Sequence, residues 1–179
     1  MVLRAATLDG RIRTVLALPT DWRILDVAKD GRALLSSERV LRQIEVWSDN
    51  RPQPQDVSLF DQSLGSAISK DGTSVLLSNQ GSIAGTTYAT YLRRLDQTEA
   101  VRLGDGQAVD LSPDGQWSLS IVYGPPSRLL LLPLGAGKTT ELPNTRKMTI
   151  QAAGFIDGRR VVFLAGLGHE PLRLYERTS

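Results

Sequence analysis

The chain has 179 residues, of which 41% are hydrophobic and 22% charged, and its formal net charge is +2. This length is enough for one domain with a sizeable core, and the composition is that of an ordinary folded protein. The absence of cysteine excludes disulfides and Cys-ligated metal sites. The basic residues are scattered along the chain, which argues against a nucleic-acid partner.

The sequence carries no targeting or membrane segment that we can identify. It has no run of about 18 apolar residues, so we expect no membrane span. The N-terminus lacks the apolar core of a signal peptide. Taken alone, the chain is expected to be cytoplasmic. It would be periplasmic or extracellular if it is a fragment of a membrane-anchored parent.

The first predicted element is a hairpin in residues 1–19, with strands near 3–7 and 13–18 around an Asp-Gly turn. Four further Asp-Gly turns follow at a nearly constant spacing of 41, 43 and 43 residues, at Asp30, Asp71, Asp114 and Asp157. Each turn separates two strands with apolar positions at matching offsets. The carboxylates are expected to bond to backbone N–H groups two residues later, which favours a structural role over a calcium array.

After each of these hairpins the sequence predicts a loop, a third strand and a short fourth strand. The third strands are expected at residues 42–47, 88–95, 128–132 and 172–175, and a fourth strand is clearest at 99–103. No segment shows helical apolar spacing with caps, so we expect about 17 strands and an all-β fold.

A period of about 42 residues is typical of the four-stranded blade of a β-propeller. We expect a single domain over residues 1–179, with blades at about 22–60, 61–103, 104–143 and 144–179 and a partial blade at 1–19. A ring of about four blades could close through the N-terminal strand. A partial arc of a larger propeller and a homodimer that completes a larger ring stay open as alternatives.

The turn segments DLSPDGQW, ISKDGTSVLLS, VAKDGRALLSS and GFIDGRRVVFLAG resemble the TolB-like propeller repeats, a WD-repeat-like family. TLDGRIRTVLALP and VRLGDGQAVDLSPDGQW are similar to propeller regions of bacterial proteins that often follow a serine/threonine kinase domain and a membrane span. The resemblance implies a bacterial propeller used for binding, without catalytic residues. The kinase signatures themselves are absent from the sequence.

Three features resemble functional sites but are expected to be structural. The stretch GAGKTT at residues 135–140 lacks the first glycine and the following helix of a phosphate-binding loop, so we expect a turn. His169 is the single histidine and is expected in a loop, so we expect no metal site and no cofactor. Trp22, Trp47 and Trp117 are expected to pack between blades.

The loops between second and third strands vary most in sequence, and variable loops on a rigid scaffold often carry function. We therefore expect a binding rim made of Trp22, Glu38, Arg39, Tyr88, Tyr123, His169 and Glu170. The first hypothesis is a non-catalytic module that binds a protein or peptide. The alternatives are a sensory fragment of a larger receptor kinase or TolB-like envelope protein, with a small molecule in a central channel, and, least favoured, a propeller hydrolase or lyase.

Overall fold

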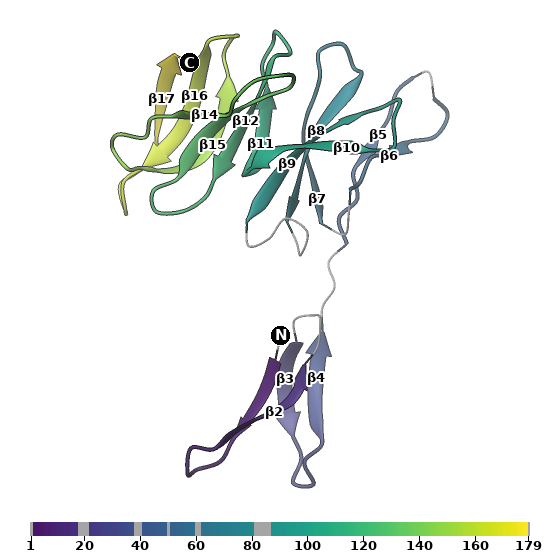
Figure 1. Cartoon of the computed structure of the whole chain (residues 1–179), viewed down its shortest axis with the longest axis vertical. Helices are drawn as coiled ribbons and strands as arrows, with labels where there is room; N and C mark the ends of the chain where they lie inside the picture. The colour runs from purple at the N-terminus through teal and green to yellow at the C-terminus, as the bar shows by residue number, and fades with distance from the viewer. Residues whose placement is uncertain are drawn as a thin grey trace. The chain divides into compact units, whose positions relative to one another are not determined.

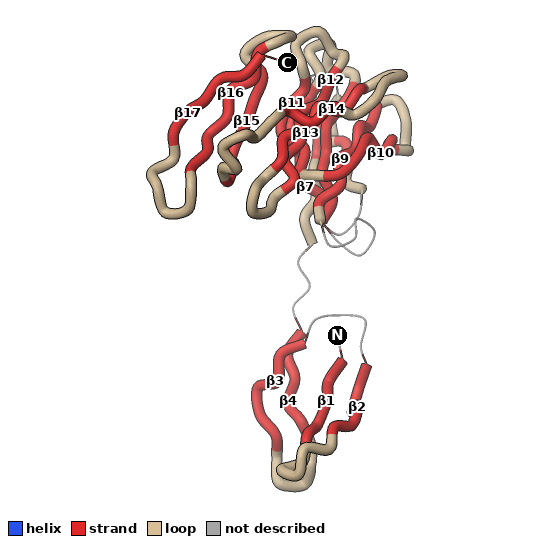
Figure 2. The backbone as a smooth tube through the Cα atoms, turned by 60° about the vertical axis from the view of Figure 1, so that its left-hand side comes forward, coloured by secondary structure: helices blue, strands red, loops and turns tan. Residues whose placement is uncertain are grey.

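A computed structural model describes residues 2–17, 22–37, 41–49, 51–59, 62–80 and 87–178. Over these ranges the chain forms strands, turns and loops and no helix (Figure 2). The described residues contain seventeen strands, the number expected from the sequence, and all the sheets are antiparallel. The all-β class is therefore confirmed. The chain divides into an N-terminal unit, residues 1–40, and a C-terminal unit, residues 41–179.

The N-terminal unit consists of two antiparallel hairpins. The first pairs β1 (Val2–Ala6) with β2 (Ile12–Ala17), and the second pairs β3 (Trp22–Val27) with β4 (Ala33–Ser37). Their turns carry Gly10 and Gly31 at φ values of 84° and 88°, a region that glycine enters without steric cost. The Asp-Gly dipeptides therefore end the strands where the sequence predicts.

The C-terminal unit begins with a short hairpin of β5 (Glu45–Val46) and β6 (Gln55–Asp56). Three sheets follow in chain order (Figure 1), each with sequential strands as neighbours. The first contains β7 (Ser63–Ile68), β8 (Ser74–Gln80), β9 (Tyr88–Arg94) and β10 (Ala100–Asp105). The second contains β11 (Gln107–Leu111), β12 (Trp117–Val122), β13 (Arg128–Pro133) and β14 (Thr140–Leu142). The third contains β15 (Thr149–Phe155), β16 (Arg160–Gly166) and β17 (Arg173–Thr178).

One irregularity recurs in the first strand of each of the four hairpins with the periodic Asp-Gly turns. The pairing register of β3, β7, β11 and β15 shifts by one residue near the middle of the strand. The residues left without a partner are Leu25, Ser66, Val109 and Gln151. A bulge of this kind increases the local twist of the strand. The repeat is therefore structural as well as sequential, down to the position of the bulge.

The carboxylates of the Asp-Gly turns act as the sequence predicts. Asp30, Asp71 and Asp114 each accept a hydrogen bond from the backbone N–H two residues later, at 3.1 Å, and Asp157 does so at 2.8 Å. Several donors hold the pKa of Asp71, Asp114 and Asp157 below the ordinary value of 3.8. For Asp71 and Asp114 the strongest donor is the serine hydroxyl two residues earlier, and for Asp157 it is the N–H of Arg159. The structural interpretation of these residues is confirmed.

The largest group of buried apolar residues lies between the second and third sheets. Leu119 and Ile121 of β12 meet Ile150, Val161 and Phe163 of the third sheet. Hydroxyl groups join the first and second sheets instead: Ser78 Oγ accepts from the N–H of Ala108 at 2.7 Å, and the buried Thr90 and Ser120 hydroxyls lie 2.6 Å apart. Consecutive sheets are therefore joined by one apolar and one partly polar interface.

Backbone bonds place the loops at two opposite ends of these sheets. The N–H of Leu95, after β9, donates to Thr73 O in the Asp71 turn, and the N–H of Leu134 donates to Gln116 O in the same way. These turns form what we call the turn end. At the other end, the loop after β12 is held to the segment before β15 by the N–H of Ser127, which donates to Met148 O at 3.3 Å. The turns after the first and third strands therefore lie together at one end of these sheets, and the loops after the second strands lie at the other.

The structure places the tryptophans differently from one another. Trp117 packs against the main core, as expected. Trp47 is 65% exposed, so the expectation that it packs between blades is wrong. Val46 packs inward against the Val57 cluster, and alternate residues of a strand point to opposite faces, so the next residue faces outward. The blade boundaries and the single-domain assignment stay predictions.

Candidate binding groove at the turn end

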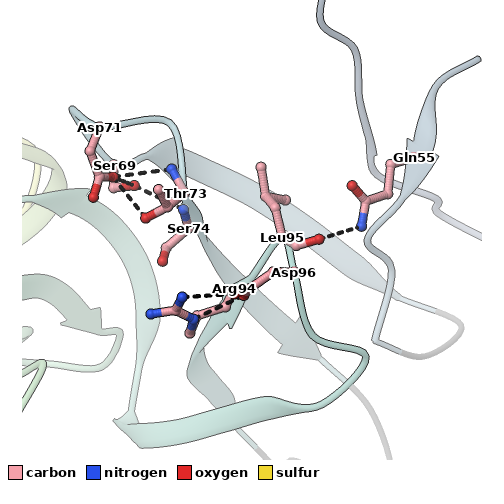
Figure 3. Close-up of polar contacts among 8 residues, drawn as sticks. All are labelled: Gln55, Ser69, Asp71, Thr73, Ser74, Arg94, Leu95 and Asp96. Carbon is pink, nitrogen blue, oxygen red and sulfur yellow. Dashed lines mark hydrogen bonds and ion pairs between the residues drawn. The ribbon is translucent and has the colours of Figure 1, made fainter. Parts of the chain in front are cut away.

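The β5–β6 hairpin is fastened to the β7–β10 sheet by both apolar and polar contacts. Val57 is fully buried with Val75 and Leu77 of β8. The guanidinium of Arg93 donates to Ser58 O at 3.1 Å. Gln55 Nε2 donates to Leu95 O at 2.9 Å, across 40 residues of sequence (Figure 3). The hairpin therefore forms a fixed wall beside the turn end of the sheet.

A groove with a volume of about 510 Å³ lies between this wall and the turns of the β7–β10 sheet. Two large apolar side chains on its lining are open to solvent, Trp47 at 65% and Ile68 at 54% exposure. The rest of its lining is made of Val46, Ser48, Arg51, Gln55, Gly72, Thr73, Arg94, Leu95 and Asp96. We call this the hairpin groove.

A second groove of about 370 Å³ lies between the Asp71 turn and the Asp114 turn of the next sheet. It shares Thr73 and Arg94 with the hairpin groove and adds Lys70 to its lining. The two grooves therefore adjoin one another along the turn end.

Arg94 and Asp96 form a bidentate ion pair on the lining of the hairpin groove (Figure 3). Arg94 Nε and Nη2 donate to the two carboxylate oxygens at 2.9 and 2.8 Å. This pairing raises the pKa of Arg94 above its ordinary value and lowers that of Asp96 below 3.8. Both groups are therefore ionised at neutral pH, and the charge of Asp96 is compensated.

Arg51 lies on the other side of the hairpin groove and has a different partner. Its Nη1 donates to Gln55 Oε1, an oxygen of a neutral amide. Because Gln55 in turn donates to Leu95 O, the Arg51 guanidinium is positioned by the turn after β9. The arrangement offers a cation beside two exposed apolar side chains.

The structure brings two of the residues expected in the binding rim into contact. Tyr88, at the start of β9, and Tyr123, after β12, meet edge to face with ring centroids 6.1 Å apart. Tyr123 is 44% exposed, and its partial burial and the neighbouring Tyr88 raise its pKa above 10.0. The loop that follows is held because Ser127 Oγ donates to Gly124 O and accepts from the N–H of Ile150.

The other expected rim residues are placed separately. His169 and Glu170 are exposed in the turn between β16 and β17, where the N–H of Glu170 donates to Leu167 O at 2.8 Å. Trp22 is half-buried at the start of β3 in the N-terminal unit. Glu38 and Arg39 lie outside the described residues. The rim as a binding surface stays a prediction.

The binding rim expected from the sequence did not include the groove residues Trp47, Arg51 and Arg94. An isolated tryptophan beside a short strand has the same pattern whether it is buried or exposed. The sequence does contain one indication: Val46 and Trp47 are consecutive, and consecutive residues of a strand point to opposite faces, so one of the two side chains is expected to be exposed to solvent. The stretch 135–140 forms a loop followed by β14, as expected, without a helix at which phosphate could bind.

Within the described ranges, no group of three or more His, Asp or Glu side chains is arranged to hold a metal ion. The same ranges contain no helix of the length and apolar character needed to cross a membrane.

No model of a protein family and no curated protein matches the chain. The solved structures similar to the chain include two TolB structures. One, assigned as TolB, is from Agrobacterium tumefaciens, with a TM-score of 0.60 and 18% identity over 94% of this chain and 62% of that one. The other is TolB from Acinetobacter baumannii, with a TM-score of 0.57 and 16% identity over 99% of this chain and 46% of that one. The chain spans less than two thirds of each, and at this identity the likeness shows a TolB-like fold alone.

Proposed function

We propose that this chain is a non-catalytic binding module of the β-propeller type that holds an extended segment of a partner protein in the hairpin groove. The observation that carries the proposal is the pair Trp47 and Ile68, two large apolar side chains exposed on one groove beside Arg51. Tryptophan and arginine are enriched among residues that dominate binding energy, and exposed apolar patches mark interaction surfaces.

The shape of the groove supports a peptide segment as the occupant. Its volume of about 510 Å³ falls in the range of small-ligand sites, enough for a few side chains. The adjoining groove continues the same surface along the turn end through Thr73 and Arg94. A segment that runs through both would contact two successive Asp-Gly turns.

Selection of short random peptides displayed on phage tests this proposal. We expect the wild-type chain to enrich peptides whose binding is lost in the Trp47→Ala, Ile68→Ala double variant. The matched control is Leu174→Ala, Val101→Ala, which removes side chains of 71% and 63% exposure outside the groove. Enriched peptides that bind the groove double variant as well as wild type would contradict the proposal.

The Tyr88–Tyr123 pair is a second candidate surface for the same binding function, because it presents aromatic rings on a loop held by hydrogen bonds. Peptides that respond to Tyr123→Ala rather than to the groove variant would favour it. The TolB-like fold is equally compatible with the receptor-kinase or envelope-protein alternative, in which the chain would lie outside the cytoplasm. Among the residues that the structure describes, no feature favours a hydrolase or lyase.

The number of blades and their closure are also part of this proposal. A homodimer differs in its mass in solution from a ring or an arc formed by a single chain. Light scattering on a size-exclusion column distinguishes them: a monomer of 19.6 kDa favours a self-contained module, and twice that mass favours a dimer.

A further inference from the structure

Resting on the proposed function, we propose that the hairpin groove selects segments in which a carboxylate side chain lies next to a bulky apolar one. The apolar residue would sit against Trp47 and Ile68, and the carboxylate would pair with Arg51. The proposal names the chemistry of the partner, which the proposed function leaves open.

The apolar lining of the hairpin groove is partly buried and partly exposed to solvent. Val46 and Leu95 pack against the Val57 cluster from one side and line the groove from the other. Trp47 and Ile68 extend this apolar surface into solvent. A bulky side chain placed there removes apolar area of both partners from water, at about 25 cal/mol per Å².

The two arginines on the lining of the hairpin groove differ in their partners. The described lining of the hairpin groove contains two arginines and one acidic residue. Arg94 is occupied by Asp96 through two hydrogen bonds, whereas the partner of Arg51 is the neutral amide of Gln55. The lining therefore carries one uncompensated positive charge, and it is at Arg51.

The carboxylate of Asp71, in the turn between β7 and β8, does not supply the missing negative charge. Asp71 is outside the hairpin groove, and its Oδ1 accepts from Ser69 Oγ, Thr73 N and Thr73 Oγ1 (Figure 3). In the adjoining groove, Arg94 is already paired with Asp96, so Lys70 stands against the two carboxylates of Asp71 and Asp114 and that lining has no excess positive charge. A carboxylate is therefore favoured at the Arg51 side of the surface, and an additional cation is disfavoured there by like charge.

The test uses three blocked peptides, Gly-Ser-Leu-Asp-Ser-Gly and its counterparts with Asn in place of Asp or Ala in place of Leu. The readout is the indole N–H signal of Trp47 in a nitrogen-15 correlation spectrum, identified by its absence in Trp47→Phe. We expect the Leu-Asp peptide to shift this signal. The Leu-Asn peptide should bind about fivefold more weakly, the range of an exposed ion pair.

The variant Arg51→Gln should bind the Leu-Asp and Leu-Asn peptides equally. The matched control is Arg102→Gln, an arginine paired with Asp105 outside the groove, which should keep the preference. Equal binding of the Asp and Asn peptides to wild type would overturn this inference and leave the proposed function standing. If none of the peptides shifts the Trp47 signal while the spectrum stays dispersed, this inference fails, and the selection of peptides on phage then decides whether the proposed function fails with it.

Discussion

Thr90 and Ser120 meet hydroxyl to hydroxyl at 2.6 Å across the interface of the first two four-stranded sheets, and both side chains are fully buried. The Thr90 hydroxyl also contacts Gly106 O at 2.8 Å, in the short connection between the two sheets. One threonine therefore links β9, β12 and the turn that joins the sheets.

We predict that Thr90→Val destabilises the chain more than Ser120→Ala. Valine keeps the volume of threonine but leaves Gly106 O and the Ser120 hydroxyl without this partner, at a cost of about 1–3 kcal/mol. After Ser120→Ala, Thr90 still has Gly106 O, so the expected cost is about 1 kcal/mol. Urea unfolding measures both, and the exposed Thr140→Val is the control. Equal effects of the two buried substitutions would contradict this account.

Gly106 is a position where we expect any side chain to be costly. Its φ is 97°, and a Cβ there would lie 2.9 Å from Ile121 O. Gly106→Ala should lower the free energy of unfolding by about 1–3 kcal/mol through backbone strain and this close approach. Gly135→Ala is the control, because a Cβ at Gly135 meets no atom within 4 Å. Thermal unfolding should separate the two variants, and similar melting temperatures would refute the prediction.

We predict that the carboxylates of the Asp-Gly turns make the stability of the fold decrease at acidic pH. The pKa of Asp114 is lowered in the fold, chiefly by the Ser112 hydroxyl, below the value of 3.8 expected when unfolded. Its contribution is therefore complete above about pH 3.8 and is lost as the pH falls through the lower folded pKa. Asp114→Asn should reduce the loss of stability between about pH 5 and pH 2. Carboxyl titration by NMR checks the direction, and a folded pKa above 3.8 would contradict it.

We predict that the ionisation of Tyr123 lowers the stability of the fold at alkaline pH. Burial and the neighbouring Tyr88 raise its pKa above 10.0. The unfolded chain therefore ionises this phenol first, and stability is lost as the pH rises from about 10 toward the folded pKa. Tyr123→Phe should remove a component of the tyrosinate absorbance that titrates above pH 10. A titration curve unchanged above pH 10 in the variant would show that Tyr123 is not the shifted group.

The sequence by itself was sufficient to predict the hairpins, their turns and the all-β class. These features depend on bonds between residues only a few positions apart, such as Asp71 with Thr73, and on glycine at positive φ in Gly31 and Gly72. These local hydrogen bonds form wherever the same residues recur. The turns and bulges of the structure therefore repeat with the same spacing as the Asp-Gly motifs of the sequence.

Only the tertiary structure decided which surfaces are joined and which stay open. The contacts of Gln55 with Leu95 and of Thr90 with Ser120 connect residues 40 and 30 positions apart, and nothing in either local sequence specifies the partner. The exposure of Trp47 depends on which face of the short β5 packs inward, so the groove was not apparent in the sequence. Burial depends on packing between segments that are distant in sequence. The repeat pattern predicts the strands, but it does not predict which faces of these strands pack against one another.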